Sequence, residues 1–467
     1  MTYGEPLLRE GKRHRMCDVI VIGVGLAGLT AGLRLAQEGR RVLLLAKGVG
    51  GTHLGSGTID VLGYGDGLTG NPRSARAGNT ARDSSDRIEH PAAALPDFLA
   101  KHPDHPYSHA GLPVLAAATH WFIRALDAEG YPFVGSLGDN FLLPTAIGAV
   151  KPAALVPRSM AAGDLRAGGN FVIVGFPNLK DFYPALVTDN LAHTTWEASP
   201  DAEMLPGRQS LSARPVLLDP PGLTEEADLS LLDLARAFDR PDFRAALTAE
   251  LRPLLRPGER VGFPAALGLN DSLTAWRDLE TRLDAPVFEI PTLPPSIAGI
   301  RLFERLEGAL RASGARLQIG FPVVEAQIGN GRCAAVVTQG AARTYTWRAK
   351  HFILATGGIA SGGIVAEPDG TVRETIFGLP LVGLPGPESP RFLPGYFDRH
   401  PFNRVGLAVD DRMRPLNEDG RPALTNLYTA GATLAHAEPW REKSGDGISL
   451  ITGYRAAEAI LEEERKR

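Results

Sequence analysis

The chain has 467 residues, more than one compact domain usually needs, so we expect two lobes that each bury a core. A net charge of −4 excludes the basic surface that binding to nucleic acid or to an anionic membrane would require. The two cysteines, Cys17 and Cys333, are too few for a disulfide framework or an ordinary iron–sulfur cluster, and they favour a reducing cytoplasm.

The N-terminal segment combines a basic run at residues 12–15 with an apolar stretch from Val19 to Leu29. A signal peptide has the same pattern, but this apolar stretch contains a glycine fingerprint with an explanation of its own. No apolar run reaches the ~20 residues that a membrane-spanning helix requires. We therefore interpret residues 1–15 as a mobile tail and predict no membrane span.

The first predicted unit is strand–helix–strand. Asp18 to Ile22 is a short apolar strand of the kind that is buried on both faces of a parallel sheet. A helix from Leu26 to Glu38 is ended by Gly39, and a second strand runs from Arg41 to Leu45. Residues 63–92, rich in Gly, Ser, Asp and Arg, are predicted to form a long surface loop.

Further strand–helix units are predicted between about residues 95 and 300, around a Pro-rich irregular segment at 197–230. A later helix begins after Ser296, a suitable N-cap, and ends before Gly314. Short alternating strands then predict an antiparallel meander that returns to a buried strand. The predicted strands are Phe171–Val174, Val261–Phe263, Val323–Gln327, Ala334–Thr338, Thr344–Arg348 and Phe352–Ala355, and the predicted helices lie near Asp181–His193 and Ser272–Arg282.

The glycine fingerprint between the first strand and helix carries a specific physical requirement. Gly23 permits the tight turn, Gly25 lets the backbone approach a pyrophosphate, and Gly28 lets helix and strand pack closely. The start of the helix then offers free N–H groups and a positive dipole end to the phosphates. The alternative is a glycine-rich turn without a ligand, which the strand–helix–strand context makes the weaker interpretation.

The end of the second strand departs from the usual dinucleotide pattern. An acidic residue normally bonds a ribose hydroxyl there, but this chain has Ala46 followed by Lys47. Lys47 is a candidate phosphate-pairing cation, and the alternative is a solvated surface lysine.

Three later segments are candidates for contacts with a planar ring. Small and hydroxyl residues at 50–57 can pass close to such a ring, and the candidates there are His53, Gly55, Ser56 and Gly57. Glycines at a strand end mark the ligand crevice of an open sheet, and those candidates are Ala355, Thr356, Gly357 and Gly358. Near the C-terminus, Gly431 follows an apolar segment, and Asp446 and Gly447 open a helix that can aim its N-terminus at a ring oxygen.

The fingerprint, the strand end at Ala355–Gly358 and the closing segment Leu427–Ala432 resemble the flavoprotein superfamily that includes fumarate reductase and L-aspartate oxidase. In those relatives a lysine likewise follows the second strand and FAD is still bound. The resemblance therefore implies an α/β fold with a Rossmann-like flavin-binding domain, comprising a parallel sheet and an antiparallel meander, and an inserted second α/β or α+β lobe. We assign residues 16–95 and 315–467 to the flavin-binding domain and residues 96–314 to an inserted cap or substrate lobe.

A narrower resemblance rests on Pro291–Leu302, on His53 with Ser56 and Gly57, and on the loop Ser361–Glu367. These segments are similar to the family that forms the B subunit of anaerobic glycerol-3-phosphate dehydrogenase. The similarity runs from about residue 17 to the C-terminus, except for the polar loop, and the segment Trp440–Asp446 departs from the family pattern. The family is usually assigned FMN, whereas the fingerprint favours the dinucleotide FAD.

This resemblance implies a flavin-dependent oxidoreductase subunit in glycerol metabolism and anaerobic respiration. It would work with a catalytic flavoprotein subunit and an iron–sulfur membrane-anchor subunit, oxidise glycerol 3-phosphate to dihydroxyacetone phosphate, and pass electrons to quinone. Its location would be cytoplasmic, peripheral at the inner face of the cell membrane. The alternatives are a stand-alone flavoenzyme of the fumarate reductase class that acts on a small carboxylate, and a flavin-free structural subunit.

His53, Arg301 and Arg373 are the candidate catalytic residues. Arg301 lies in the first turns of the helix after Ser296, where free N–H groups and a guanidinium form a plausible site for a phosphate or carboxylate. Arg373 follows the strand end at Ala355–Gly358. The competing interpretation for Arg301 is structural, an ion pair with an acidic neighbour such as Glu304 or Glu325.

Overall fold

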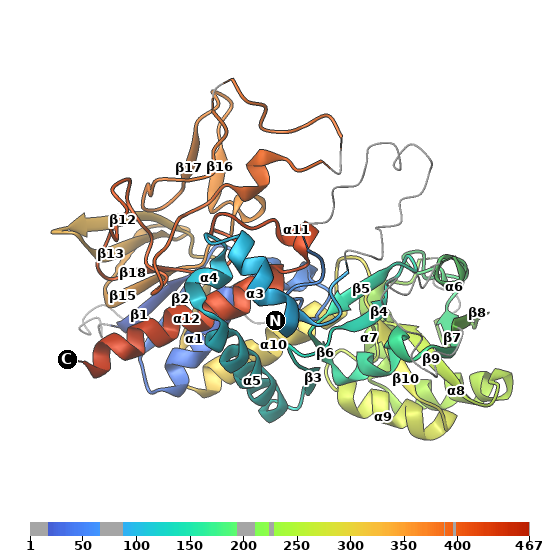
Figure 1. Ribbon diagram of the computed structural model, residues 1–467. Helices are drawn as coiled ribbons and strands as arrows, with labels where there is room; N and C mark the ends of the chain where they lie inside the picture. Colours follow the sequence, from blue (N-terminus) through green and yellow to red (C-terminus); the bar gives the residue numbers. More distant parts are fainter. Residues whose placement is uncertain are drawn as a thin grey trace.

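The computed structural model describes residues 17–65, 87–193, 211–223, 228–386, 388–395 and 398–466. The predicted tail at 1–15 and most of the predicted loop at 63–92 lie outside these ranges. The described chain forms two parallel sheets, with helices and smaller antiparallel elements around them (Figure 1). This arrangement confirms the predicted α/β class.

The first sheet is parallel throughout, as the apolar strands predicted, because strands buried on both faces carry apolar side chains on both. Its strands are assembled from the two ends of the chain, so residues far apart in sequence become neighbours. In spatial order they are β11 (Arg316–Ile319), β2 (Val42–Ala46), β1 (Cys17–Ile22), β15 (Ala349–Leu354) and β18 (Leu427–Thr429).

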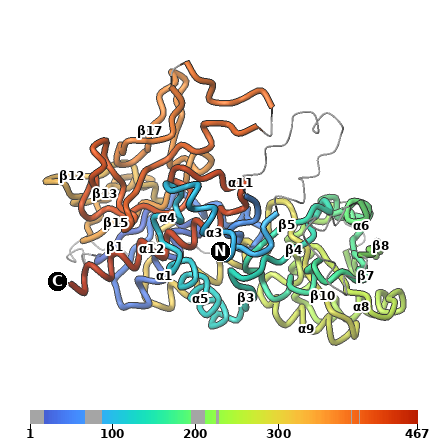
Figure 2. Tube along the Cα trace, viewed as in Figure 1, coloured from blue at the N-terminus to red at the C-terminus, as the bar shows by residue number. Residues whose placement is uncertain are grey.

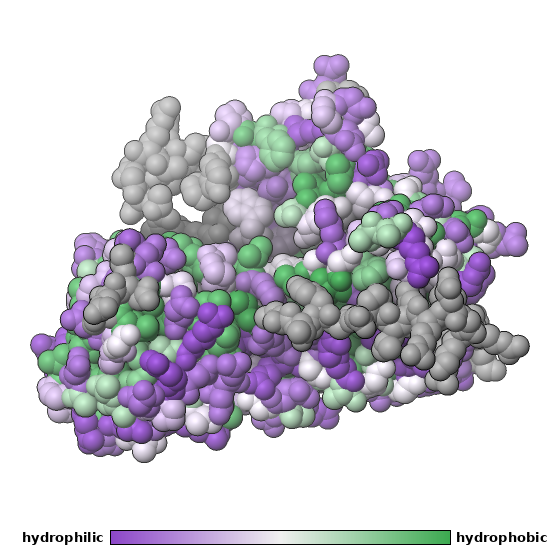
Figure 3. All heavy atoms as spheres, turned by 180° about the vertical axis from the view of Figure 1, so that it is seen from behind, coloured by the Kyte–Doolittle hydropathy of each residue, from purple (hydrophilic) through white to green (hydrophobic). Residues whose placement is uncertain are grey.

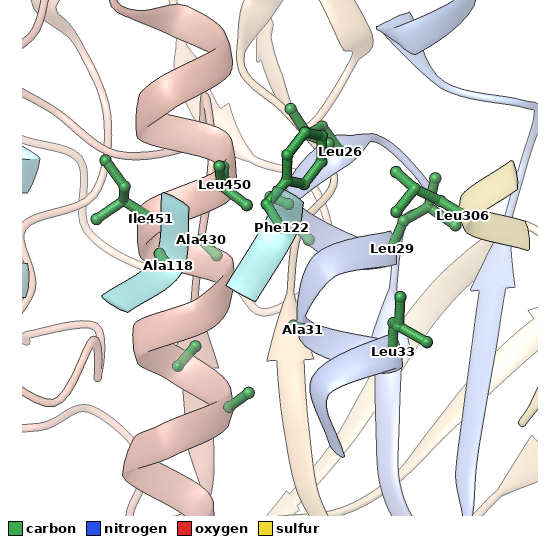
Figure 4. Close-up of a cluster of buried hydrophobic side chains, with 14 of the residues drawn as sticks. Leu26, Leu29, Ala31, Leu33, Ala118, Phe122, Leu306, Ala430, Leu450 and Ile451 are labelled. Carbon is green, nitrogen blue, oxygen red and sulfur yellow. The ribbon is translucent and has the colours of Figure 1, made fainter. Parts of the chain in front are cut away.

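Three long helices pack together on one face of this sheet: α1 (Leu26–Gln37), α10 (Ile297–Ala312) and α12 (Gly445–Arg465). Helix α12 lies beside α1, so the C-terminal segment packs on the N-terminal one (Figure 2). Figure 4 shows buried side chains of these helices, among them Leu26, Leu306 and Leu450, together with Phe122 of a fourth helix, α5 (Leu112–Ala128). Each large side chain buried there stabilises the fold by roughly 1.5–3 kcal/mol relative to exposure.

The opposite face of the sheet is covered by the predicted meander. Strands β12 (Val323–Gly329), β13 (Arg332–Gln339) and β14 (Thr344–Trp347) pair antiparallel in that order. Apolar side chains of the sheet, such as Ile20 and Phe352, share a core with Val336 of the meander. The first lobe is therefore layered as helices, sheet and meander (Figure 1).

The second sheet lies beside the first lobe and is also parallel (Figure 1). It comprises, in spatial order, β10 (Val287–Ile290), β9 (Glu259–Pro264), β7 (Gly169–Gly175) and β8 (Leu211–Leu217), and its helices are α6 (Pro184–Ala192), α7 (Leu231–Phe238), α8 (Pro241–Leu251) and α9 (Ser272–Leu283). Strand β8 corrects the expectation that residues 197–230 are irregular. It is an edge strand, a position that tolerates Pro215 in a way that a central strand does not.

Other elements were not predicted from the sequence. They include α3 (Pro91–Lys101), α4 (Pro106–Ala110), α5 (Leu112–Ala128), α11 (Pro439–Glu442), and the antiparallel pairs β3 (Phe133–Gly135) with β6 (Leu155–Pro157), β4 (Phe141–Pro144) with β5 (Val150–Ala153), and β16 (Ile364–Ala366) with β17 (Val372–Glu374). Helices α5 and α10 fall inside the predicted inserted lobe, yet they pack on α12 and α1 of the first core. The division of the chain at residues 95 and 314 stays a prediction.

The surface seen from behind Figure 1 is mostly polar, with apolar side chains in smaller groups (Figure 3). Among the residues that the structure describes, no helix is both long and apolar enough to cross a lipid bilayer.

Candidate functional site

The junction of β1 and α1 contains two glycines that packing requires and one that faces open space. A Cβ on Gly23, whose φ is 116°, would lie 2.1 Å from the carbonyl oxygen of Ala355. A Cβ on Gly28 would lie equally close to the oxygen of Gly23. Gly25, the N-cap of α1, has no side-chain cap and nothing within 4 Å of its Cβ position. The free N–H groups at the start of α1 therefore adjoin space that can receive an anion.

The loop at 50–57 lies beside this junction. A Cβ on Gly50 would come within 2.9 Å of the backbone nitrogen of Gly25. The loop is held by the start of α10, because the Ser296 N–H donates to the His53 carbonyl oxygen at 3.2 Å. Close packing of Gly299 on the Thr52 oxygen fixes it further. The Ser296 hydroxyl accepts from the Gly299 N–H at 3.0 Å, which confirms the predicted N-cap.

Gly55 and Gly57 are the remaining glycine candidates of this loop. Gly57 has a φ of 76° and packs directly on Ala298 of α10, where a Cβ would lie 2.5 Å from the Ala298 methyl. Gly55 ends the 3-10 turn η1 (Gly51–Leu54) and makes only ordinary contacts. Gly57 is therefore fixed as glycine by packing, whereas Gly55 is not.

The strand end at Ala355–Gly358 and the segment at Gly431 also lie at the junction of β1 and α1. Ala355 donates its N–H to the Ile22 oxygen at 2.8 Å, and Gly358 packs on the Ala432 oxygen. Gly431, with a φ of 81°, lies against the Ala27 methyl of α1. The structure thus brings together the four segments that the sequence singled out.

Three buried side-chain atoms around these loops lack hydrogen-bond partners among the described residues: Thr52 Oγ1, His53 Nε2 and Thr356 Oγ1. Buried polar atoms in folded proteins are normally hydrogen-bonded, so an orphaned atom calls for a partner that the protein chain does not supply. Together with the open space at Gly25, these atoms fit a polar ligand that extends from α1 across the loop at 50–57 to Thr356.

His53 lies on η1. Its ring is half-buried and meets the Phe303 ring edge-on, with the ring centroids 4.6 Å apart. Burial lowers the pKa of His53, against a weaker opposing effect of Glu307, so the imidazole is neutral at neutral pH. Lys47 follows β2 and is exposed, and no ion pair joins it to any part of the chain that the structure describes. The roles of both residues stay predictions.

A polar cluster that the sequence did not reveal lies at the start of α12. Ser56 Oγ is 2.8 Å from Thr58 Oγ1, and Thr58 accepts from Lys151 Nζ at 3.0 Å. Lys151 also forms an ion pair with Asp60, whose carbonyl oxygen accepts the N–H of Gly447 at 2.9 Å. The cluster therefore links the loop at 50–57 to the predicted site residues Asp446 and Gly447. Lys151 comes from β5 and carries no sequence signal that would connect it to Asp60.

Asp446 is partly exposed and lies among charged groups. Burial, followed by the neighbouring charge of Asp60, raises the pKa of Asp446 to about 7, while Lys151 and Lys443 oppose the shift. A carboxyl with that pKa exchanges its proton near neutral pH, as a general base or acid requires.

Asp446→Asn tests this environment. Because the pKa of Asp446 is higher in the folded state than the ordinary 3.8, ionising it costs stability as the pH rises from about 4 to 7, and the full cost remains above 7. Asparagine cannot ionise, so we expect the variant to be more stable than the wild type at pH 8 by roughly 1–3 kcal/mol. Urea denaturation at several pH values should show this difference shrinking toward pH 4. A difference that does not change with pH would contradict the assignment.

Arg301 is placed differently from the anion site that we expected. Its side chain is 1% exposed, and its Nη1 lies 2.9 Å from a carboxylate oxygen of Glu289. Its Nε donates to the Gly268 oxygen at 2.7 Å. The prediction that Arg301 pairs with Glu304 or Glu325 was wrong. Its partner is Glu289, which strand β10 holds against helix α10. A buried and paired guanidinium is not accessible to a ligand in solution, so the structure favours the structural interpretation.

Arg373 lies on β17 and is exposed. It forms an ion pair with Glu367 at 3.0 Å, within the hairpin of β16 and β17. The sequence placed Arg373 in a loop after the strand end at Ala355–Gly358, whereas the structure places it on a strand of this hairpin, which the Thr375 N–H joins to the Gly363 oxygen. The catalytic role of Arg373 stays a prediction.

Comparison with known proteins places the sequence of this chain in one family. A family model described as an FAD binding domain matches residues 18–448. The chain is 33% identical to a probable B subunit of anaerobic glycerol-3-phosphate dehydrogenase from Halobacterium salinarum, over 95% of this chain and 98% of that relative. It is 31% identical to the B subunit of anaerobic glycerol-3-phosphate dehydrogenase from Pectobacterium carotovorum, over 96% of this chain and 99% of that relative.

Proposed function

The chain belongs to the FAD-binding domain family and, within it, to the B subunits of anaerobic glycerol-3-phosphate dehydrogenase; from this premise we propose that it takes part in the oxidation of glycerol 3-phosphate to dihydroxyacetone phosphate. One observation carries the proposal. The β1–α1 junction, the loop at 50–57, the strand end at 355–358 and the segment at Gly431 lie together in a chain that matches these relatives over nearly its whole length.

The residues at the junction fit FAD. The start of α1 and the space at Gly25 suit a pyrophosphate, and the orphaned atoms of Thr52 and Thr356 suit polar groups of the cofactor. Bound FAD supplies an acceptor for the two electrons that leave the substrate. We assign to these residues the holding of the cofactor, and to the glycines the close approach of the backbone.

Oxidation of a secondary alcohol to a ketone removes a hydride equivalent from carbon and a proton from oxygen. We propose Asp446 for the proton transfer, because it opens α12 beside the polar cluster that joins the loop at 50–57, and its pKa is raised toward neutrality there. The positive charge of Lys151 offsets the negative charge of the Asp60 carboxylate, and hydrogen bonds of these two residues connect the start of α12 to the loop at 50–57. His53, neutral beside Phe303, is a second candidate for contact with the substrate or ring.

The names of the relatives describe one component of a larger enzyme, and we propose that this chain likewise works in a complex. Its partners would be a catalytic flavoprotein subunit and an iron–sulfur subunit that anchors the assembly at the inner face of the membrane. Electrons would leave through the metal centres of that partner to quinone.

Anaerobic mixing of the purified complex with glycerol 3-phosphate tests the proposal. We expect the visible flavin absorption to bleach, and quinone reduction to require the partner subunits. Fast quinone reduction by this chain alone would contradict the assembly. Bleaching by a small carboxylate such as succinate, and none by glycerol 3-phosphate, would favour a stand-alone enzyme of the fumarate reductase class.

A further inference from the structure

A cavity of about 390 Å³ lies outside the segments described above. It is lined by Gly383, Arg399, His400, Pro401, Arg404, His436 and Glu438. Backbone hydrogen bonds fix its walls to one another, since Val382 donates to Gly406 at 2.9 Å and His436 donates to the Arg404 oxygen at 3.0 Å. Its volume is within the range of small-molecule sites.

The lining of the cavity is rich in groups that favour an anion. Two arginines and two histidines face one carboxylate, Glu438. Arg399 approaches Glu438 at 4.0 Å, so this arginine lies beside the one carboxylate of the lining. Arg404 donates to the His436 carbonyl oxygen at 3.2 Å, and no ion pair joins Arg404 to any residue within the described ranges.

Hydrogen bonds join the walls of the cavity to segments that adjoin the FAD-binding site. The Thr433 carbonyl oxygen, just after Gly431, accepts the N–H of Leu407, so the wall that carries Arg404 is paired with the segment after β18. On the other side, Glu438 donates its N–H to the Glu442 carboxylate, which also accepts from the Ser444 hydroxyl at the start of α12. The cavity walls are thus built on the same segments that lead to Gly431 and Asp446.

We propose that this cavity binds the phosphate group of a phosphate monoester substrate, with Arg399 and Arg404 as the cationic groups that receive it. Guanidinium groups match the oxygens of a phosphate with paired hydrogen bonds. Arg404, which forms no ion pair with the described residues, can supply such bonds, and Arg399 adds positive charge at the same cavity. This inference rests on the proposed function, because glycerol 3-phosphate supplies such a phosphate. It replaces the anion site that the sequence suggested at Arg301.

Binding measurements on the flavin-loaded protein test the inference. The ligands are glycerol 3-phosphate, inorganic phosphate and succinate, and calorimetry measures their affinities. We expect Arg399→Gln and Arg404→Gln each to weaken glycerol 3-phosphate binding ~10- to 100-fold, as for the loss of a hydrogen bond to a charged group. The matched control is Arg236→Gln, since Arg236 is exposed on α7 and pairs with Asp233 far from the cavity in sequence.

Flavin content and thermal unfolding establish that each variant is folded. Arg404 also supports the His436 backbone, so Arg399→Gln serves as the second variant if Arg404→Gln loses stability. Unchanged affinity in both folded variants would overturn the inference, even if glycerol 3-phosphate bleaches the wild-type flavin. If phosphate binding depends on these arginines but glycerol 3-phosphate leaves the flavin oxidised, the cavity assignment stands and the proposed reaction fails. Tighter binding of succinate than of either phosphate compound would also overturn it.

Discussion

Replacing Gly25 by valine is expected to abolish FAD binding while leaving the protein folded. Nothing lies within 4 Å of the Cβ position at Gly25, and its φ of −67° is open to any residue. The added branches would instead occupy the space in front of α1 that the pyrophosphate needs. The ratio of flavin absorbance to protein after desalting measures the effect, and thermal unfolding reports on the fold.

Gly329→Val is the matched control, because Gly329 on β12 is equally open but lies in the meander. It should retain its flavin. Gly28→Val makes a second contrast, since its side chain would collide with the Gly23 oxygen and disrupt the β1–α1 packing itself. Full flavin occupancy in folded Gly25→Val would remove the α1 terminus from the cofactor site.

Replacing Arg301 by alanine should cost about 3–5 kcal/mol of folding stability, the typical result of removing one partner from a buried ion pair. The carboxylate of Glu289 would remain buried, with only Ser159 and the Leu267 N–H to satisfy it. Flavin content per folded molecule should stay unchanged, because the hydrogen bonds of the Arg301 side chain go to Gly268 and Glu289, outside the FAD-binding segments. Urea denaturation followed by circular dichroism measures the loss.

Arg311→Ala provides the comparison on the same helix. Arg311 is exposed and pairs with Glu307, so its removal should change stability by less than about 1 kcal/mol. A variant Arg301→Ala that keeps wild-type stability but loses affinity for glycerol 3-phosphate would restore the anion-site interpretation and argue against the structural one.

Local sequence patterns predicted those elements of the fold that are determined by residues adjacent in sequence. The apolar strand before Gly23, the cap at Ser296 and the meander after Val323 each follow from a few adjacent residues. Strand β8 was missed because Pro215 obscured its pattern, and an edge position tolerates that residue.

The cofactor loops could be found from sequence because glycine and hydroxyl residues cluster where backbone approaches a ligand. The ion pairs could not, because they join residues from separate elements. Lys151 of β5 meets Asp60 of an earlier loop, and Glu289 of β10 meets Arg301 of α10, so each pair forms only when distant elements pack together. The cavity at Arg404 has the same origin, since its walls come from three separate stretches of chain.

The identity of the flavin released from the denatured wild-type protein tests the central claim most directly. Chromatography of the supernatant after heat denaturation separates FAD from FMN. The start of α1, open at Gly25, and the convergence of the loops around it predict FAD, bound non-covalently. Release of FMN without FAD, or of no flavin from protein made in flavin-replete cells, would contradict the account.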